Sequence, residues 1–387
     1  MAYQNVFTPR FYIDYLSYWH SMGFIKSITA NEESGTSMEG NIVGLNPSSN
    51  CTLLQSGLEQ YVQVDIEFNT NISNRVLNNI NVLGVLGHNQ YRTFDDAGYT
   101  FPEIIIYAKN ENNETVGYIR AEDSTLHTEK EICNFMPSMS SGDHEYTYNF
   151  LEKGWSMGKC EFAPTSIYND EINDINKICF RLRHNRGNYG FGDLNEEILT
   201  NCLVIGHFYD MPHSPDLDLK MEIEFDGYDN VETIGGSTLT NVRYTGNPKW
   251  GELNAWDIKE SDPYVKRNGR RNWNLKFSFI SDKDLFPTNS NSSNFMQTTS
   301  IYQNFQDFES NKTSSGYQFI ETIADHNSFI SQVLNYVGNG HRFIFHPDIV
   351  NENPDQFAIC ILDQDSLNIS QKSFKAYEFS LKIKEVW

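Results

Sequence analysis

Residues 62–68 read VQVDIEF, a stretch in which apolar and polar side chains alternate at every position. A period of two places the apolar side chains on one face of a β-strand and the polar side chains on the other. The segment therefore predicts a strand from a sheet with one buried face. It decides the fold class, because runs of the same kind recur along the rest of the chain.

These further runs are short, and polar connections that contain glycine separate them. They cover residues 80–86, 103–108, 116–120, 178–183, 202–208, 219–225, 273–279, 342–346 and 377–383. Many short strands with almost no amphipathic helix are typical of antiparallel sandwiches. We therefore predict a mainly β protein, with an antiparallel β-sandwich (jelly-roll) domain and a second β-rich domain that carries one covering helix.

The length of 387 residues exceeds what one hydrophobic core usually holds, so we expect more than one packed unit. Residues 1–50 combine an aromatic, proline-containing segment with a loop-like composition, which predicts an extended arm that packs on a neighbour. Residues 51–212 would form the jelly roll and residues 213–387 the second domain. Within the latter, helical spacing over 321–337 predicts the covering helix.

Charge and composition exclude several classes of protein. The chain carries 51 acidic and 29 basic residues, for a net charge of -22, which disfavours nucleic acid as a partner. Hydrophobic residues make up 39% and aromatic residues 14%, which excludes disorder. We interpret one basic cluster as a salt-bridge surface between strands or subunits; it comprises Lys266, Arg267, Arg270, Arg271 and Lys276.

Cysteine spacing and hydropathy predict where the protein is made and whether it enters a membrane. The six cysteines form no C-x-x-C pair, so we expect free, mostly buried thiols. No apolar run approaches the ~20 residues of a membrane-spanning helix, and the first residues do not resemble a signal peptide. We expect a soluble protein that is made in a cytoplasm and does not insert into a membrane.

No motif for a catalytic site is present. The chain lacks Gly-x-Ser-x-Gly, a phosphate-binding glycine loop and His-Glu-x-x-His, so we predict neither enzymatic activity nor a cofactor. A pair of glycosidase carboxylates stays open, because sequence alone cannot place two acids across a cleft. Four aspartates could hold calcium or line a solvated strand edge, and we favour the edge; they are Asp210, Asp216, Asp218 and Asp226.

Aromatic residues in or near polar, glycine-containing loops are candidates for sugar binding, because aromatic rings stack on sugar rings. They are Tyr91, Phe94, Tyr189 and Phe191. The same residues could instead anchor their loops at the rim of the core, and we favour that interpretation. Glycan binding is kept as the alternative function.

Several segments resemble proteins of one family. Residues 84–89 (GVLGHN) and 201–209 are similar to the start and the closing strand of a galactose-binding-like (discoidin-like) jelly-roll module in tailed-phage virion proteins. Other blocks are similar to ones that recur in this order in phage tail structural proteins. They are residues 8–13, 211–217, 235–239, 269–275, 343–348, 353–358 and 385–387. At one position the chain departs from the family, since it carries His346 where related proteins often have Gln.

The resemblance implies a structural component of the phage tail or of its distal tip or baseplate. Such a protein is made in the host cytoplasm and ends in the virion. Its expected partners are copies of itself in a symmetric ring, other tail proteins and, for the alternative function, host-surface glycans. A glycan-cleaving tail enzyme is the third hypothesis. Arginine and aromatic side chains suit buried subunit contacts, and the interface candidates are Arg10, Phe11, Tyr12, Arg267, Arg270, Arg271 and Trp273.

Overall fold

The computed structural model describes most of the chain. The described residues are 6–30, 42–46, 52–55, 62–72, 74–90, 93–95, 98–121, 135–139, 146–150, 154–164, 175–186, 196–217, 219–225, 228–242, 269–286, 328–338, 340–351 and 356–386. The fold is mainly β, with antiparallel sheets and few helices, which confirms the predicted β-sandwich-rich class.

One sheet lies wholly in the first half of the chain. Its strands pair in the order β2 (Ile25–Ala30), β4 (Val62–Ile72), β12 (Ile175–Arg186), β7 (Gly98–Asn110) and β8 (Thr115–Ala121). Shorter strands extend the other end of β7; they are β6 (Thr93–Asp95), β10 (Tyr146–Phe150) and β9 (Phe135–Met139). The alternating residues 62–68 form β4, and their burial alternates as the sequence predicts.

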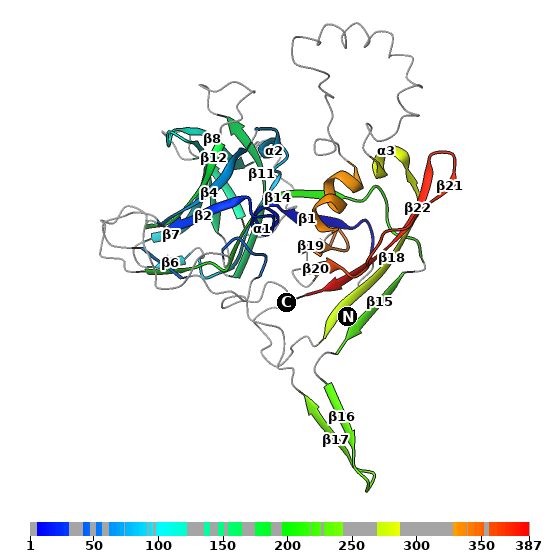
Figure 1. The fold of residues 1–387 in the computed structure, drawn as a ribbon. Coiled ribbons are helices and arrows are strands. Elements are labelled where there is room, and N and C mark those ends of the chain that lie inside the picture. The colour runs from blue at the N-terminus through cyan, green and yellow to red at the C-terminus, as the bar shows by residue number, and fades with distance from the viewer. Residues whose placement is uncertain are drawn as a thin grey trace, which may run out of the picture.

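A second sheet runs through both halves of the molecule (Figure 1). Its order is β11 (Gly154–Pro164), β5 (Val82–His88), β14 (Cys202–Asp210), β1 (Arg10–Asp14), β19 (Phe343–His346), β20 (Ala358–Leu362), β22 (Ala376–Glu385), β18 (Arg270–Ser281) and β15 (Lys220–Glu224). The short β21 (Ile369–Ser373) pairs with β22. The far half of β11 pairs with β8, so this strand joins the two sheets.

Two ribbons form separate two-stranded sheets in the described part of the chain. One pairs β3 (Thr52–Gln55) with β13 (Glu196–Leu199), and the other pairs β16 (Tyr228–Glu232) with β17 (Thr238–Val242). Figure 1 shows the β16–β17 hairpin projecting away from the rest of the fold, beyond the end of β15.

The first core lies between the two sheets, as in a sandwich. It joins apolar side chains of β4, β7 and β12 to those of β5 and β14, with α1 (Tyr15–Ser21) and α2 (Asn74–Asn78) at its margin. The Asp14 side chain begins α1 by accepting bonds from Leu16 N and Ser17 N. Its carboxylate also accepts a bond from Ile205 N on β14, so the helix is tied to the sheet.

The second core lies between the long sheet and a helical segment. This segment is a π-helix, η3 (Ile330–Leu334), followed by α6 (Asn335–Val337), and the short α3 (Asp282–Leu285) follows β18. The Phe329 ring, next to η3, stacks on Phe379 of β22 with centroids 5.2 Å apart. The predicted covering helix is therefore present over residues 330–337, and residues 321–327 lie outside the described part.

The N-terminal segment differs from the arm that the sequence predicts. Residues 10–14 are extended, but β1 pairs with β14 on one edge and with β19 on the other. All five residues are buried. Tyr12 packs in an apolar cluster on one face of the sheet, while Phe11 and Ile13 pack in another. This segment is thus an internal strand that connects both halves of the chain.

Candidate interaction surfaces

Three of the predicted interface aromatics are core residues. Phe11, Tyr12 and Trp273 are all buried. The Phe11 ring contacts Phe329, Phe343 and Phe345, and the Trp273 ring meets Phe345 edge-on at 5.2 Å. The expectation that these side chains face another subunit is corrected, because the chain's own strands cover them.

Two of the predicted arginines pair inside the chain. Arg10 donates from Nε and Nη2 to the Asp210 carboxylate, and its guanidinium lies 4.1 Å from the Phe208 ring centre. Arg271 is almost fully buried and donates to both oxygens of Glu385. These ion pairs hold neighbouring strands together, so both arginines are corrected from interface to internal positions.

Of the rest of the basic cluster, the structure describes Arg270 and Lys276. Arg270 is half-buried on β18, and Lys276 pairs with Glu378 of the adjacent β22 at 3.1 Å. Like Arg271, Lys276 forms a salt bridge between neighbouring strands, one of the two kinds that the sequence suggested. Lys266 and Arg267 lie outside the described residues.

The structure places few of the candidate ligand residues. Phe94 belongs to β6, whereas Tyr91, Tyr189 and Phe191 lie outside the described residues. Asp210 pairs with Arg10 and Asp216 accepts bonds from Ser278, while Asp218 and Asp226 are not described. Among the described residues no group of three or more His, Cys, Asp or Glu could hold a metal ion. No described helix is long and apolar enough to cross a membrane.

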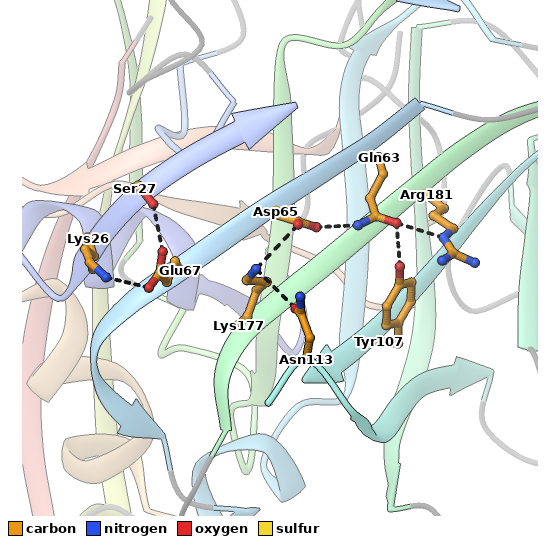
Figure 2. A network of polar contacts seen from close by, with 9 residues as sticks. All are labelled: Lys26, Ser27, Gln63, Asp65, Glu67, Tyr107, Asn113, Lys177 and Arg181. Carbon is orange, nitrogen blue, oxygen red and sulfur yellow. Dashed lines mark hydrogen bonds and ion pairs between the residues drawn. The ribbon is translucent and has the colours of Figure 1, made fainter. Parts of the chain in front are cut away.

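A network of polar side chains covers the outer face of β2, β4, β12 and β7 (Figure 2). Gln63 is its centre, because its amide oxygen accepts from Tyr107 Oη at 2.6 Å and from Arg181 Nε at 2.9 Å. Its amide nitrogen donates to Asp65, which pairs in turn with Lys177. These contacts link β4 to both β12 and β7 across the face.

The ends of this network are equally well paired. At one end Lys26 donates to Glu67 at 2.6 Å, and this hydrogen bond lowers the pKa of the Glu67 carboxyl (Figure 2). At the other end the Tyr107 ring is buried beneath the Arg181 guanidinium, 4.8 Å away. A buried ring offers no open face on which a sugar could stack.

Strand β15 exposes apolar side chains at the edge of the long sheet. Met221 lies opposite Trp273 and Ile223 lies opposite Arg271, so both point to the core side of the sheet. Nevertheless Met221, Ile223 and the following Phe225 are 38%, 47% and 68% exposed. The alternation predicted this strand correctly, but here the apolar side chains stay partly exposed.

The β16–β17 hairpin adds more exposed apolar surface. Val231 and Leu239 are directly paired on one face, and Ile234 at the tip is fully exposed. The turn is well defined, since Thr233 N donates to Ser237 O and Ser237 N donates to Thr233 Oγ1. Residues 229–241 are all exposed except the partly buried Thr233.

Sequence reasoning missed this hairpin, although a signal was present. Gly235 and Gly236 separate two short segments rich in β-branched residues, a pattern typical of a hairpin. Gly236 adopts a φ of 80°, which glycine accepts without steric cost. The hairpin could therefore have been predicted, but its projection from the fold could not.

Comparisons with protein-family models, with curated proteins and with solved structures found no match to this chain.

Proposed function

We propose that this chain is a structural subunit of a tailed-phage virion, in the tail or at its distal tip or baseplate, and that it works by packing against other subunits. The single observation that carries the proposed packing role is the projecting β16–β17 hairpin, with Val231, Leu239 and Ile234 exposed. The phage assignment itself comes from the resemblance of residues 84–89 and of the tail-protein blocks.

The stability of the β16–β17 hairpin supports packing against another subunit. A two-stranded hairpin is at best marginally stable in water when nothing packs on it. This one keeps its own side chains exposed and points apolar groups into solvent. Contiguous exposed apolar surface commonly marks an interaction site. A neighbouring subunit that covers Val231 and Leu239 would supply the missing packing.

The experiment measures the abundance of the chain in purified virions by quantitative mass spectrometry, with and without changes to the hairpin. The test variant carries Val231→Thr, Ile234→Asn and Leu239→Thr, which keep the β-propensity of both strands. The matched control is Glu232→Gln, on the opposite face of the same hairpin. We expect a fixed multi-copy stoichiometry for the wild type and the control, and loss of incorporation for the test variant.

Two outcomes oppose the proposal. Absence of the wild-type chain from virions contradicts a structural role. Normal incorporation of the triple variant contradicts the role of the hairpin.

Two other results would favour other functions. Binding of the isolated protein to sugars on a glycan array would favour the alternative, a host-surface adhesin. Release of products from host polysaccharide would favour the tail enzyme.

A further inference from the structure

Strand β15 ends the long sheet. Among the described residues it pairs only with β18, so its other edge carries backbone N–H and C=O groups without a strand partner. Proteins usually protect such an edge, because it can pair with another chain. Here the edge is flanked by the exposed apolar side chains Met221 and Ile223.

The sequence of β15 is complementary to itself when read in the antiparallel direction. The strand reads KMEIE over residues 220–224. If Glu222 lies opposite Glu222 of a second copy, then Lys220 lies opposite Glu224 and Met221 lies opposite Ile223. Each of these two pairings occurs twice. Opposite charges and apolar pairs across antiparallel strands both stabilise a sheet.

The charges of these side chains suit that pairing. Lys220 is exposed and makes no ion pair within the described part of the chain. Glu224 accepts bonds from Lys384 and Asn272, and both bonds go to Oε2. A carboxylate accepts hydrogen bonds on both oxygens. The bond from Lys384 is also the main cause of the lowered pKa of Glu224, so this group stays ionised.

We infer that β15 pairs antiparallel with β15 of a second copy of this chain, across a twofold axis at Glu222. This inference rests on the proposed function, because it names a second copy of this chain as one of the subunits against which the chain packs. The two sheets become one continuous sheet through the axis. The Met221 and Ile223 side chains of both copies then lie together on the core side.

We expect this contact between two copies to be weak. Two Glu222 side chains meet at the axis, and like charges directly opposite destabilise a strand pair. A five-residue strand also buries less than the ~1,000 Å² of a stable interface. The pairing therefore depends on concentration, which suits a subunit that meets its copies on an assembling particle. An isologous contact closes a pair, so a larger ring requires a second contact such as the hairpin.

A charge-swap experiment tests the register. Lys220→Glu places two acids opposite each other twice in a homodimer, and Glu224→Lys does the same with two lysines. We expect each variant alone to dimerise about tenfold more weakly than the wild type by analytical ultracentrifugation. A mixture of the two variants restores both opposite-charge pairs, so it should form heterodimers at wild-type affinity or better.

A cross-linking experiment covers the case in which Glu224→Lys disturbs the fold. Glu222→Cys brings two thiols together at the axis, while the described native cysteines are buried. Ser380→Cys, exposed on the outer face of β22, is the matched control. We expect mild oxidation to give a disulfide-linked dimer for Glu222→Cys and monomer for Ser380→Cys. Equal cross-linking of the two variants overturns the inference, as does a mixture that dimerises no better than its components.

These results are independent of the test of function. Dimerisation of the pure protein without incorporation into virions contradicts the proposed function and leaves the strand pairing intact. Incorporation into virions with no pairing at Glu222 contradicts the inference and leaves the function intact.

Discussion

Arg271 and Glu385 form an ion pair inside the second half of the fold, on the adjacent strands β18 and β22. The Arg271 backbone N–H and its Nε both donate to Glu385 Oε2, at 2.9 and 3.1 Å. Its Nη2 donates to Glu385 Oε1 and to the carbonyl oxygen of Phe357, the residue before β20. Both side chains are almost fully buried, so the pair cannot exchange its bonds for water.

Removal of one partner should therefore destabilise the chain. Arg271→Met leaves the Glu385 carboxylate buried without its counter-charge, and we expect a loss of about 3 to 5 kcal/mol in the free energy of unfolding. Urea unfolding followed by tryptophan fluorescence measures this loss. The double variant with Glu385→Leu should recover most of it, because no charge is then left unpaired. A single variant as stable as the wild type contradicts the role of the pair.

This pair also changes how the basic cluster can be tested. Reversal of Arg271 to Glu would place two acids together in the core and unfold the sheet. Loss of assembly in such a variant would not report on an interface.

Histidine burial predicts a loss of stability in acid. His207 Nε2 donates to the Gln332 carbonyl oxygen at 2.6 Å, and burial lowers the pKa of this imidazole to about 4. The folded pKa lies below the unfolded value, so the contribution of neutral His207 is fully present above about pH 6.5. It is lost as the pH falls towards 4, at up to about 1.4 kcal/mol per pH unit.

The measurement is the free energy of unfolding of the wild type and of His207→Gln between pH 4 and pH 8. We expect a shallower decline in acid for the variant, with the exposed His20→Gln as control. Burial also raises the pKa of Asp14 to about 7. Between about pH 4 and pH 7 the folded chain therefore holds a proton on Asp14 that the unfolded chain releases, so this group makes the fold more stable as the pH falls and opposes the trend from His207. The difference between the two proteins isolates His207, and equal slopes would count against the assignment.

Gly206 permits the close approach of β1 to β14. A Cβ atom at this position would lie 1.7 Å from the Ile13 carbonyl oxygen. Gly206→Ala must therefore separate the two strands, and we expect a cost of about 3 kcal/mol or more. Gly235→Ala at the hairpin tip, where a Cβ would meet no atom within 4 Å, is the control. Thermal unfolding of both variants checks the contrast, and a stable Gly206→Ala protein disproves the close approach.

Phe279 adopts a backbone conformation that is unfavourable for its side chain. It lies in a β-bulge of β18 with a φ of 63° and is 74% exposed. The left-handed region costs a residue with a Cβ roughly 1 to 2 kcal/mol. Phe279→Gly removes this strain. The greater freedom of glycine in the unfolded chain offsets part of the gain, so we expect a net stabilisation of up to about 1 kcal/mol in chemical unfolding. Phe279→Ala, which keeps the strain, is the control and should give no gain.

Alternation predicted the strands that have one buried face. Residues 62–68 and 273–277 show it clearly, and both form strands with the expected burial. In β1 the alternation is missing because both faces are covered, and charged residues at its ends have internal partners in Asp210 and Ser17. The segment 10–14 therefore resembled an arm to be bound by a neighbour.

The candidate interface could be predicted only in part. The alternation of residues 221–225 predicts a strand, but it cannot indicate whether another element covers the apolar face. Arg271 and Trp273 look like interface residues because arginine and tryptophan are common at subunit contacts. Only the fold shows that Glu385 and Phe345 already cover them.

The position of β1 between β14 and β19 has a consequence for how the chain matures. Its partners come from the middle and from near the end of the polypeptide, so this strand joins segments of very high sequence separation. Pairings of this kind form late and make folding slow. During synthesis β14 becomes available long before β19, and until then one side of β1 stays open to aggregation. The N-terminal half alone therefore leaves β1 with one of its two partners, β14, and without the other, β19.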